Sequence, residues 1–144
     1  MKKTRVMVFG TFDGLHQGHL NFFQQARNLA QNPYLIVSIA RDKNVKKIKG
    51  KKPDFSERKR LNLIKKARIS DKVILAGKDH YLEHILKECP DIIALGYDQK
   101  AYVSELKKDL KNLPCQCAGK GIFIKIVRLK PYKKHIYKNH LLKK

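Results

Sequence analysis

The amino-acid sequence predicts a single α/β domain, in which helices cover both faces of a parallel sheet of about five strands. Short apolar segments, typical of buried strands, alternate along the chain with segments of helical periodicity. Strands separated by helices in this way run parallel within one sheet. The length of 144 residues provides for one hydrophobic core. We therefore treat residues 1–144 as one domain, in which residues 131–144 form a basic tail or short helix.

The first half of the chain predicts a strand, a helix and a second strand. Lys3–Phe9 alternates around apolar residues and is followed by Gly10, which is typical of a buried strand and a turn. Gly18–Gln31 carries apolar side chains at helical spacing, and Pro33 stops this helix. Tyr34–Ala40 is almost wholly apolar, as expected for a central strand of a parallel sheet.

A basic segment leads into the second half. Glycine and proline interrupt Arg41–Pro53, which predicts a loop. Asp54 and Glu57 have the spacing of a capping box, which predicts that a helix opens there. The remaining predicted elements are strands at Lys72–Leu75, Asp91–Leu95 and Ile122–Leu129, and helices at Tyr81–Glu88 and Ala101–Asn112.

The charge is large and unevenly distributed. The chain has 33 Lys and Arg against 12 Asp and Glu, for a formal net charge of +21. Residues 41–68 contain 13 basic and 3 acidic side chains, and residues 111–144 contain 10 basic and no acidic side chains. An excess of this size favours a protein that handles phosphates or nucleic acid.

The composition argues against several other classes of protein. No apolar run approaches the roughly 20 residues that a transmembrane helix needs. The first residues lack the apolar stretch of a secretory signal, and the three cysteines, Cys89, Cys115 and Cys117, cannot all pair. We therefore expect a cytoplasmic protein without membrane association or a disulfide framework.

Residues 10–19, GTFDGLHQGH, carry the chemistry. They follow the first predicted strand and open the first predicted helix, with His16 and His19 three residues apart on one side of the helix start. Gly10 and Gly14 let backbone amides approach an anion, and the helix N-terminus adds the positive end of its dipole. Neither of the two common phosphate-loop patterns, G-x-x-x-x-G-K-[ST] and G-x-G-x-x-G, occurs here. This arrangement predicts a phosphate site.

The same residues resemble the GxFDxxHxGH signature of the cytidylyltransferase-like nucleotidyltransferases. Residues 41–53, RDKNVKKIKGKKP, are similar to the RDxxVxKxKGxKP segment of the archaeal-type FAD synthetases, which are FMN adenylyltransferases. Residues 90–99, PDIIALGYDQ, resemble the PDIIxLGxDQ segment of that family. The glycerol-3-phosphate cytidylyltransferases share the first motif and resemble the rest less closely. The resemblance implies a Rossmann-like three-layer α/β/α fold, the HxGH nucleotidyltransferase fold.

The resemblance also implies roles for individual residues. His16 and His19 would stabilise the α-phosphate during in-line attack, and Lys47 and Lys49 would neutralise the triphosphate, with Lys47 among the catalytic residues. A Ser or Thr pair that is usual in the family is replaced by Asn139-His140. For Asp13, an orienting or metal-linked role and a turn-forming role both stay open. The other nucleotide-binding positions that the resemblance implies are Gly10, Thr11, Phe12, Asp13, Gly18, Arg60, Gly96, Asp98, Asn139 and His140.

These observations lead to one main hypothesis about function and two alternatives. The main hypothesis is transfer of AMP from ATP to FMN, giving FAD and pyrophosphate, with Mg²⁺ on the triphosphate. An alternative within the same class is a CTP:glycerol-3-phosphate cytidylyltransferase. An alternative of another class is a basic nucleotide- or nucleic-acid-binding module without catalysis. The resemblance is also compatible with a homodimer, since Phe22-Phe23 suits either the core face of its helix or a subunit contact.

Overall fold

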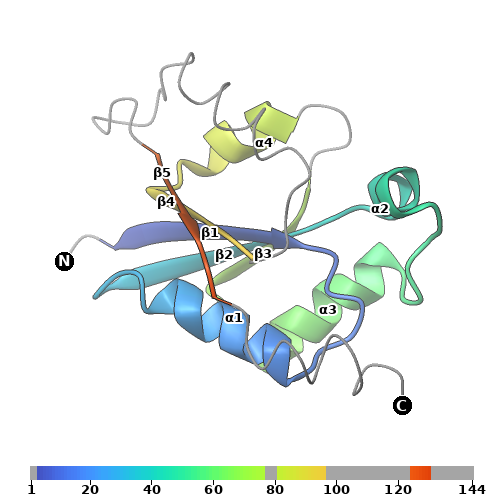
Figure 1. Ribbon diagram of the computed structural model, residues 1–144, viewed down its shortest axis with the longest axis horizontal. Coiled ribbons are helices and arrows are strands. Elements are labelled where there is room, and N and C mark those ends of the chain that lie inside the picture. The colour runs from blue at the N-terminus through green and yellow to red at the C-terminus, as the bar shows by residue number, and fades with distance from the viewer. Residues whose placement is uncertain (1–2, 77–80, 97–123, 131–144) are drawn as a thin grey trace.

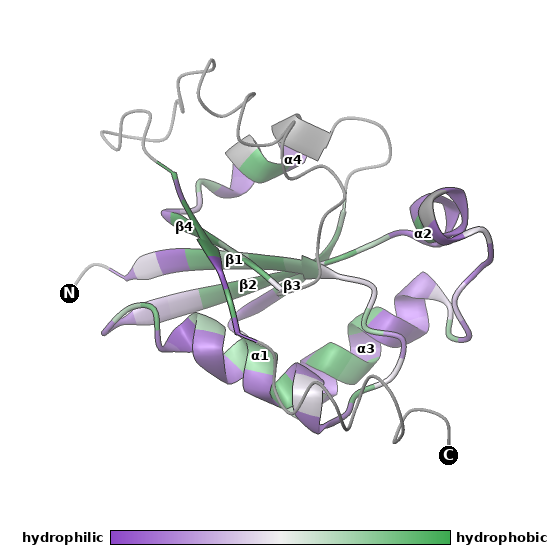
Figure 2. Cartoon of the chain, viewed as in Figure 1, coloured by the Kyte–Doolittle hydropathy of each residue, from purple (hydrophilic) through white to green (hydrophobic). Residues whose placement is uncertain are grey.

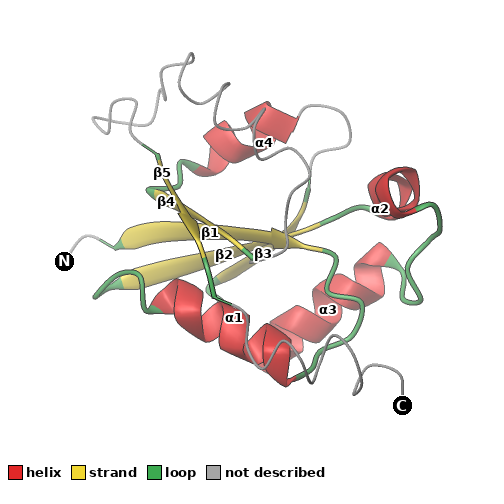
Figure 3. Ribbon diagram, viewed as in Figure 1, coloured by secondary structure: helices red, strands yellow, loops and turns green. Residues whose placement is uncertain are grey.

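The computed structural model describes residues 3–76, 81–96 and 124–130, which form a five-stranded, wholly parallel sheet with helices on both faces (Figure 1 and Figure 3). The predicted fold class is confirmed. The strands are β1 (Thr4–Gly10), β2 (Pro33–Ile39), β3 (Lys72–Leu75), β4 (Ile92–Leu95) and β5 (Lys125–Arg128). The helices are α1 (Gln17–Arg27), α2 (Asp42–Lys49), α3 (Glu57–Ala67) and α4 (Tyr81–Glu88).

The strand order is β3-β2-β1-β4-β5, so β1 lies in the centre of the sheet. From β1 the chain adds β2 and β3 on one side and returns to add β4 and β5 on the other. Parallel sheets bind ligands at such a reversal of strand order, beyond the carboxyl ends of the two strands. Here those ends are Gly10 of β1 and Leu95 of β4, which pair in register through Val8 and Ala94.

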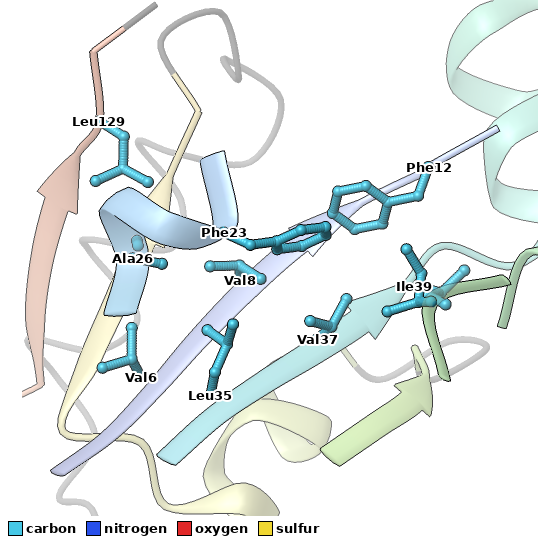
Figure 4. Close-up of a cluster of buried hydrophobic side chains, with 11 residues drawn as sticks. Val6, Val8, Phe12, Phe23, Ala26, Leu35, Val37, Ile39 and Leu129 are labelled. Carbon is cyan, nitrogen blue, oxygen red and sulfur yellow. The ribbon is translucent and has the colours of Figure 1, made fainter. Parts of the chain in front are cut away.

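The core follows the period-two alternation of the strands. Val6 and Val8 face α1 and α3, where they pack with Phe23 and Ile64 in the larger buried cluster (Figure 4). The opposite face of the sheet carries a smaller cluster under α4, centred on Ile85, Ile93 and Leu95. Figure 2 shows this division, with apolar strands between helices that carry hydrophilic residues.

Phe23 of α1 is 1% exposed, and Phe22 is partly buried against the same cluster. Of the two interpretations of Phe22-Phe23, the core face of the helix is therefore the one that the structure bears out.

The prediction of a loop at residues 41–53 was wrong, because residues 42–49 form α2. The helix begins with Asp42 in its first turn and has lysines in its last turn, both of which complement the helix dipole. Val45 is buried, and Gly50 ends the helix in a left-handed conformation with φ of 84°. Gly50 had been interpreted as a loop breaker, whereas it is a helix C-cap.

The boundaries of several elements also differ from the predictions, most clearly those of helices α3 and α1. Helix α3 begins at Glu57, and its N-cap is Ser56, whose hydroxyl accepts a hydrogen bond from the Lys59 amide, so Asp54 is not the cap. Helix α1 ends at Arg27, four residues before the predicted end at Gln31. The predicted helix at residues 101–112 and the tail at residues 131–144 lie outside the described residues.

Two further features concern the cysteines and the length of the helices. Cys89 is disulfide-bonded, which is compatible with the prediction that the three cysteines cannot all pair. Within the described part of the chain, no helix is both long and apolar enough to cross a membrane.

Candidate active site

The loop between β1 and α1 folds back onto the core through one aromatic ring. Phe12 is 5% exposed, and its ring packs at 5.1 Å from that of Phe23 and edge-on at 5.5 Å from that of His19. A Cβ atom at Gly10 would lie 2.5 Å from the Phe12 ring, so a glycine at this position leaves room for the ring. The core of the protein thus supports His19 through Phe12.

The two histidines of the motif form a stacked pair at the start of α1. Their ring centroids lie 3.9 Å apart with an interplanar angle of 21°. His16 is the N-cap of α1, and its Nδ1 accepts a hydrogen bond of 2.9 Å from the Gly18 amide. An accepting Nδ1 places the proton of the neutral His16 ring on Nε2, which becomes its donor.

Gly18, which lies between the two histidines, is required for a steric reason. A Cβ atom at Gly18 would lie 2.7 Å from Cε1 and 2.9 Å from Nδ1 of His16. The imidazole therefore caps the helix only because Gly18 has no side chain. The H-x-G-H spacing is a property of this cap and of the stacked ring one turn later.

Both imidazoles are neutral in the ligand-free site at neutral pH. Burial lowers the pKa of His16, and burial together with the neighbouring His16 lowers the pKa of His19 to about 4, although the Gly14 backbone acts in the opposite direction. Nδ1 of His19 is also buried without a hydrogen-bond partner in the part of the chain that the structure describes. The negative charge of a phosphate bound against these rings would favour their protonated forms and raise both pKa values.

Asp13 connects this loop to the segment before α3. Its two carboxylate oxygens accept hydrogen bonds from the backbone amides of Asp54, at 2.6 Å, and Phe55, at 2.8 Å. Of the roles left open for Asp13, these bonds favour the one that orients the loops.

Arg60 supports the same loop from inside the protein. Its side chain is fully buried, and its Nη1 donates to the Thr11 carbonyl at 2.7 Å. Nε donates to the Phe55 carbonyl at 3.0 Å, and Nη2 forms an ion pair of 2.6 Å with Asp42. One guanidinium thus joins the β1–α1 loop, the start of α2 and the segment before α3.

Helices α2 and α3 cap one another beside Arg60. The Asp42 amide donates to the Glu57 carboxylate at 2.9 Å, and the Glu57 amide donates to the Asp42 carboxylate at 3.2 Å. Arg41 adds a contact of 3.4 Å to Glu57. Burial alone would raise the pKa of Asp42, but the hydrogen bonds from Arg60 and the Glu57 backbone outweigh it and lower this pKa.

The sequence alone did not predict this network, which consists of Arg41, Asp42, Glu57 and Arg60. The sequence does contain a signal for this network, because Asp42 and Glu57 are acidic residues in the first turns of two helices. The interpretation of residues 41–53 as a loop concealed it.

The two lysines that the resemblance assigns to the triphosphate point in different directions. Lys47 and Lys49 are both exposed on α2, and residues two apart on a helix point about 200° away from each other. At the end of β4, the Gly96 carbonyl accepts a hydrogen bond of 2.7 Å from Arg128 of β5, another residue that sequence analysis missed. Asp98, Asn139 and His140 lie outside the described residues.

Comparison with known proteins bears on the origin of this arrangement. The model of the family described as "Cytidylyltransferase-like" matches residues 7–135. The chain belongs to the cytidylyltransferase-like family. The resemblance drawn from the sequence motifs is thus confirmed, and the stacked histidines lie within the matched residues.

Similar proteins include FAD synthases and a protein of known structure. The chain is 40% identical over 126 residues to an FAD synthase of Korarchaeum cryptofilum, covering 87% of this chain and 80% of that protein. It is 34% identical over 140 residues to an FAD synthase of Thermoplasma acidophilum, covering 97% and 92%. A crystal structure of a lipopolysaccharide core biosynthesis protein from Thermoplasma volcanium superposes with a TM-score of 0.77 at 37% identity, covering 91% of this chain and 99% of that one.

Proposed function

We propose that this protein is an FMN adenylyltransferase, which transfers AMP from ATP to the phosphate of FMN. The products are FAD and pyrophosphate. The observation that carries the proposal is the stacked pair of His16 and His19, held at the N-terminus of α1 by the Gly18 amide. Family membership and the similarity to FAD synthases support the choice of ATP and FMN.

The proposed reaction is a direct in-line transfer. An oxygen of the FMN phosphate attacks the α-phosphorus of ATP, and the bond from that phosphorus to the bridging oxygen of the β-phosphate breaks. Negative charge develops on the α-phosphate oxygens and on the departing pyrophosphate. Fixed donors that stabilise this charge are the main contribution that a protein can make to such a step. No side chain needs to act as a nucleophile.

His16 and His19 suit this task because of their environment. The Nε2–H of His16 can donate to a phosphate oxygen while its Nδ1 remains bonded to the helix. His19 is held by Phe12 and stacked on His16, so its position needs little reorganisation when the substrate arrives. The backbone at Gly10–Phe12 and the N-terminus of α1 would cradle the phosphates.

Mg²⁺ enters this proposal with the triphosphate. In the parts of the chain that the structure describes, no group of three His, Cys, Asp or Glu side chains could hold a metal ion. Both carboxylate oxygens of Asp13 already accept backbone hydrogen bonds. Mg²⁺ commonly binds through substrate phosphates and waters, and this arrangement suits such a site better than a protein-built cage.

The remaining site residues keep the roles that the resemblance implies, as part of this proposal. Lys47 and Lys49 neutralise the charge of the triphosphate from different sides of α2, since the two side chains diverge on the helix. Arg60 acts on the nucleotide through the Thr11 carbonyl, because its own side chain is buried. Gly96 and Asp98 line the nucleoside pocket, and Asn139 and His140 stand in for the usual hydroxyl pair. The homodimer and cytoplasmic location also stay predictions.

A pyrophosphate-release assay tests the proposal directly. The purified protein is incubated with Mg²⁺ and each pairing of ATP or CTP with FMN or glycerol 3-phosphate, and FAD is identified by chromatography. We expect pyrophosphate and FAD in equal amounts, only from the pairing of ATP with FMN, and release that is roughly 10²- to 10³-fold slower in the His19→Ala variant. Turnover of CTP with glycerol 3-phosphate would replace FMN adenylyltransferase with the alternative, and turnover of no pair would reject catalysis.

A further inference from the structure

Most of the positive charge of residues 41–68 has no role in the site described above. Of the 13 basic side chains in this segment, Arg41 and Arg60 take part in the network beside the β1–α1 loop. The other eleven are all exposed. Two of these, Lys47 and Lys49, belong to the proposed nucleotide site, which leaves a surface far more basic than one triphosphate requires.

The described part of the chain offers these cations few acidic partners. Asp42 and Glu57, two of the three acidic residues in the segment, are engaged by Arg60, Arg41 and the helix starts. Among the side chains that the structure describes, none of the eleven exposed cations has an ion-pair partner. Uncompensated like charge destabilises a compact fold, so an ordinary surface helix would mix both signs.

The cations of α3 are arranged on one side of the helix. Successive residues of a helix are 100° apart, so the exposed side chains at positions 58, 59, 62, 65 and 66 fall within an arc of about 120°. The buried Arg60 and Ile64 lie on the opposite side. We call this outer stripe the α3 basic face; it consists of Arg58, Lys59, Asn62, Lys65 and Lys66.

The α3 basic face extends away from the nucleotide site. Helix α3 begins beside Phe55, which Asp13 and Arg60 bind, and Lys65 and Lys66 lie in its last turn. From position 58 to position 66 the helix rises about 12 Å. Figure 1 shows α3 beginning near α2 and running away from it toward α1.

The chemistry of this face distinguishes among polyanions. Membrane-surface helices insert apolar side chains beside their cations, but the apolar side of α3 is buried under the sheet. Proteins that bind single strands stack bases on aromatic rings, and Leu20 of α1 is the only large hydrophobic residue exposed in the described part of the chain. Lys59 lies over the Phe55 ring, 4.4 Å from its centroid, but this ring is half-buried and already covered by the lysine. Four cations and an amide, with no exposed aromatic ring beside them in the described part of the chain, suit the phosphates of a duplex, which are contacted without stacking.

We propose that the α3 basic face binds the phosphate backbone of a nucleic-acid duplex, independently of base sequence and apart from the nucleotide site. Four phosphate contacts would give a plot of log K against log salt with a slope of about −3.6. This surface goes beyond the proposed adenylyltransferase activity, which needs no contact with nucleic acid.

Fluorescence anisotropy with labelled 20-base-pair duplexes of RNA and DNA, at 50 to 200 mM NaCl, tests the proposal. The double variant Lys65→Gln/Lys66→Gln should reduce the salt slope by about 1.8 and weaken binding roughly 10- to 60-fold at 0.1 M salt. The control, Lys87→Gln/Lys125→Gln, removes the same charge from exposed positions on α4 and β5 and should change binding less than threefold. Both variants should keep the wild-type circular dichroism spectrum and pyrophosphate-release activity.

Several results would overturn this inference. Absence of duplex binding at 50 mM salt would do so, as would equal losses in the two double variants, which would indicate net charge alone. Displacement of the duplex by saturating ATP would place it in the nucleotide site instead. Tighter binding to phosphatidylserine vesicles than to either duplex would assign the face to a membrane. A lack of FAD synthesis, by contrast, would reject only the proposed enzyme activity.

Discussion

The β1–α1 loop and the α3 basic face both present groups suited to phosphate, but they are built in opposite ways. In the loop, two partly buried imidazoles are stacked at 3.9 Å, and one is bonded to Gly18. On the α3 basic face, the four cations extend into solvent without ion pairs in the described part of the chain. Catalysis depends on fixed donors in a site of low dielectric, whereas counterion release needs only charge. Substitutions should therefore have sharply different effects in the two regions.

The largest effect is expected from the histidine pair. Replacement of His16 or His19 by alanine should lower kcat for pyrophosphate release by roughly 10²- to 10³-fold, because a fixed donor to the developing charge is lost. The same assay should show less than a twofold change for Lys66→Ala on the α3 basic face. Steady-state kinetics at saturating ATP and FMN measures both, and wild-type turnover in His19→Ala would remove the proposed site.

His16 also needs a control for its structural role as the N-cap of α1. Asparagine is among the best N-cap residues, so His16→Asn should keep thermal stability while losing activity. His16→Ala should lose activity and also about 1 kcal/mol of unfolding free energy. Recovery of activity in His16→Asn would show that capping, not the imidazole, is what turnover requires.

The next largest effect concerns Arg60, the buried counterpart of the exposed arginine at position 58. Arg60→Met should lower the unfolding free energy by about 2–4 kcal/mol, because Asp42 loses its charged partner and two carbonyls lose a donor. The lower part of this range allows for the partial exposure of Asp42. Arg58→Met should change stability by less than about 0.5 kcal/mol. Urea denaturation of the two variants provides the comparison, and equal stability would contradict the bonds assigned to Arg60.

The fold was predictable because its period-two and helical patterns agree with burial. Val6 and Val8 alternate as a strand requires, and Lys72–Leu75 and Tyr81–Glu88 form a strand and a helix with the predicted boundaries. Helix α2 was missed because its eight residues contain four lysines, and its C-cap glycine has the same local signal as a loop breaker. Short polar helices depend on tertiary contacts, which here come from the buried Val45 and the Asp42–Glu57 pair.

The candidate site was predictable only where the local sequence determines its geometry. Residues 16–19 form a cap and one helical turn, so their relation follows from spacing alone. Arg60 is 49 residues from the Thr11 carbonyl that it binds, and Asp13 is 41 residues from Asp54. Such contacts depend on how the elements pack together. The sequence motif therefore predicted the chemistry, and the structure shows which contacts support the residues of the motif.

A smaller effect should appear in the pH dependence of stability. The pKa of His19 is about 4 in the fold and near 6.5 when the chain is unfolded, so only the unfolded chain binds this proton between those values. The unfolding free energy should therefore fall as pH decreases from 6.5 to 4. Allowing for partial exposure of the ring, we expect a loss of about 1–2 kcal/mol that His19→Gln lacks. Urea denaturation at pH 7, 5.5 and 4.5 measures the unfolding free energy of both proteins. The same dependence on pH in the wild type and in His19→Gln would contradict the lowered pKa of His19.

The smallest effect tests the spacing of the motif itself. In Gly18→Ala, the new Cβ would meet the His16 ring at 2.7 Å and force it to move, whereas Gln17→Ala alters only an exposed neighbour. We expect kcat to fall about tenfold in Gly18→Ala and to stay within twofold in Gln17→Ala. If the loss acts through the His16 ring, then adding Gly18→Ala to His16→Ala should cost almost nothing further. A tenfold loss in both backgrounds would mean that Gly18 serves the phosphate directly, through its backbone, rather than through the histidine that it accommodates.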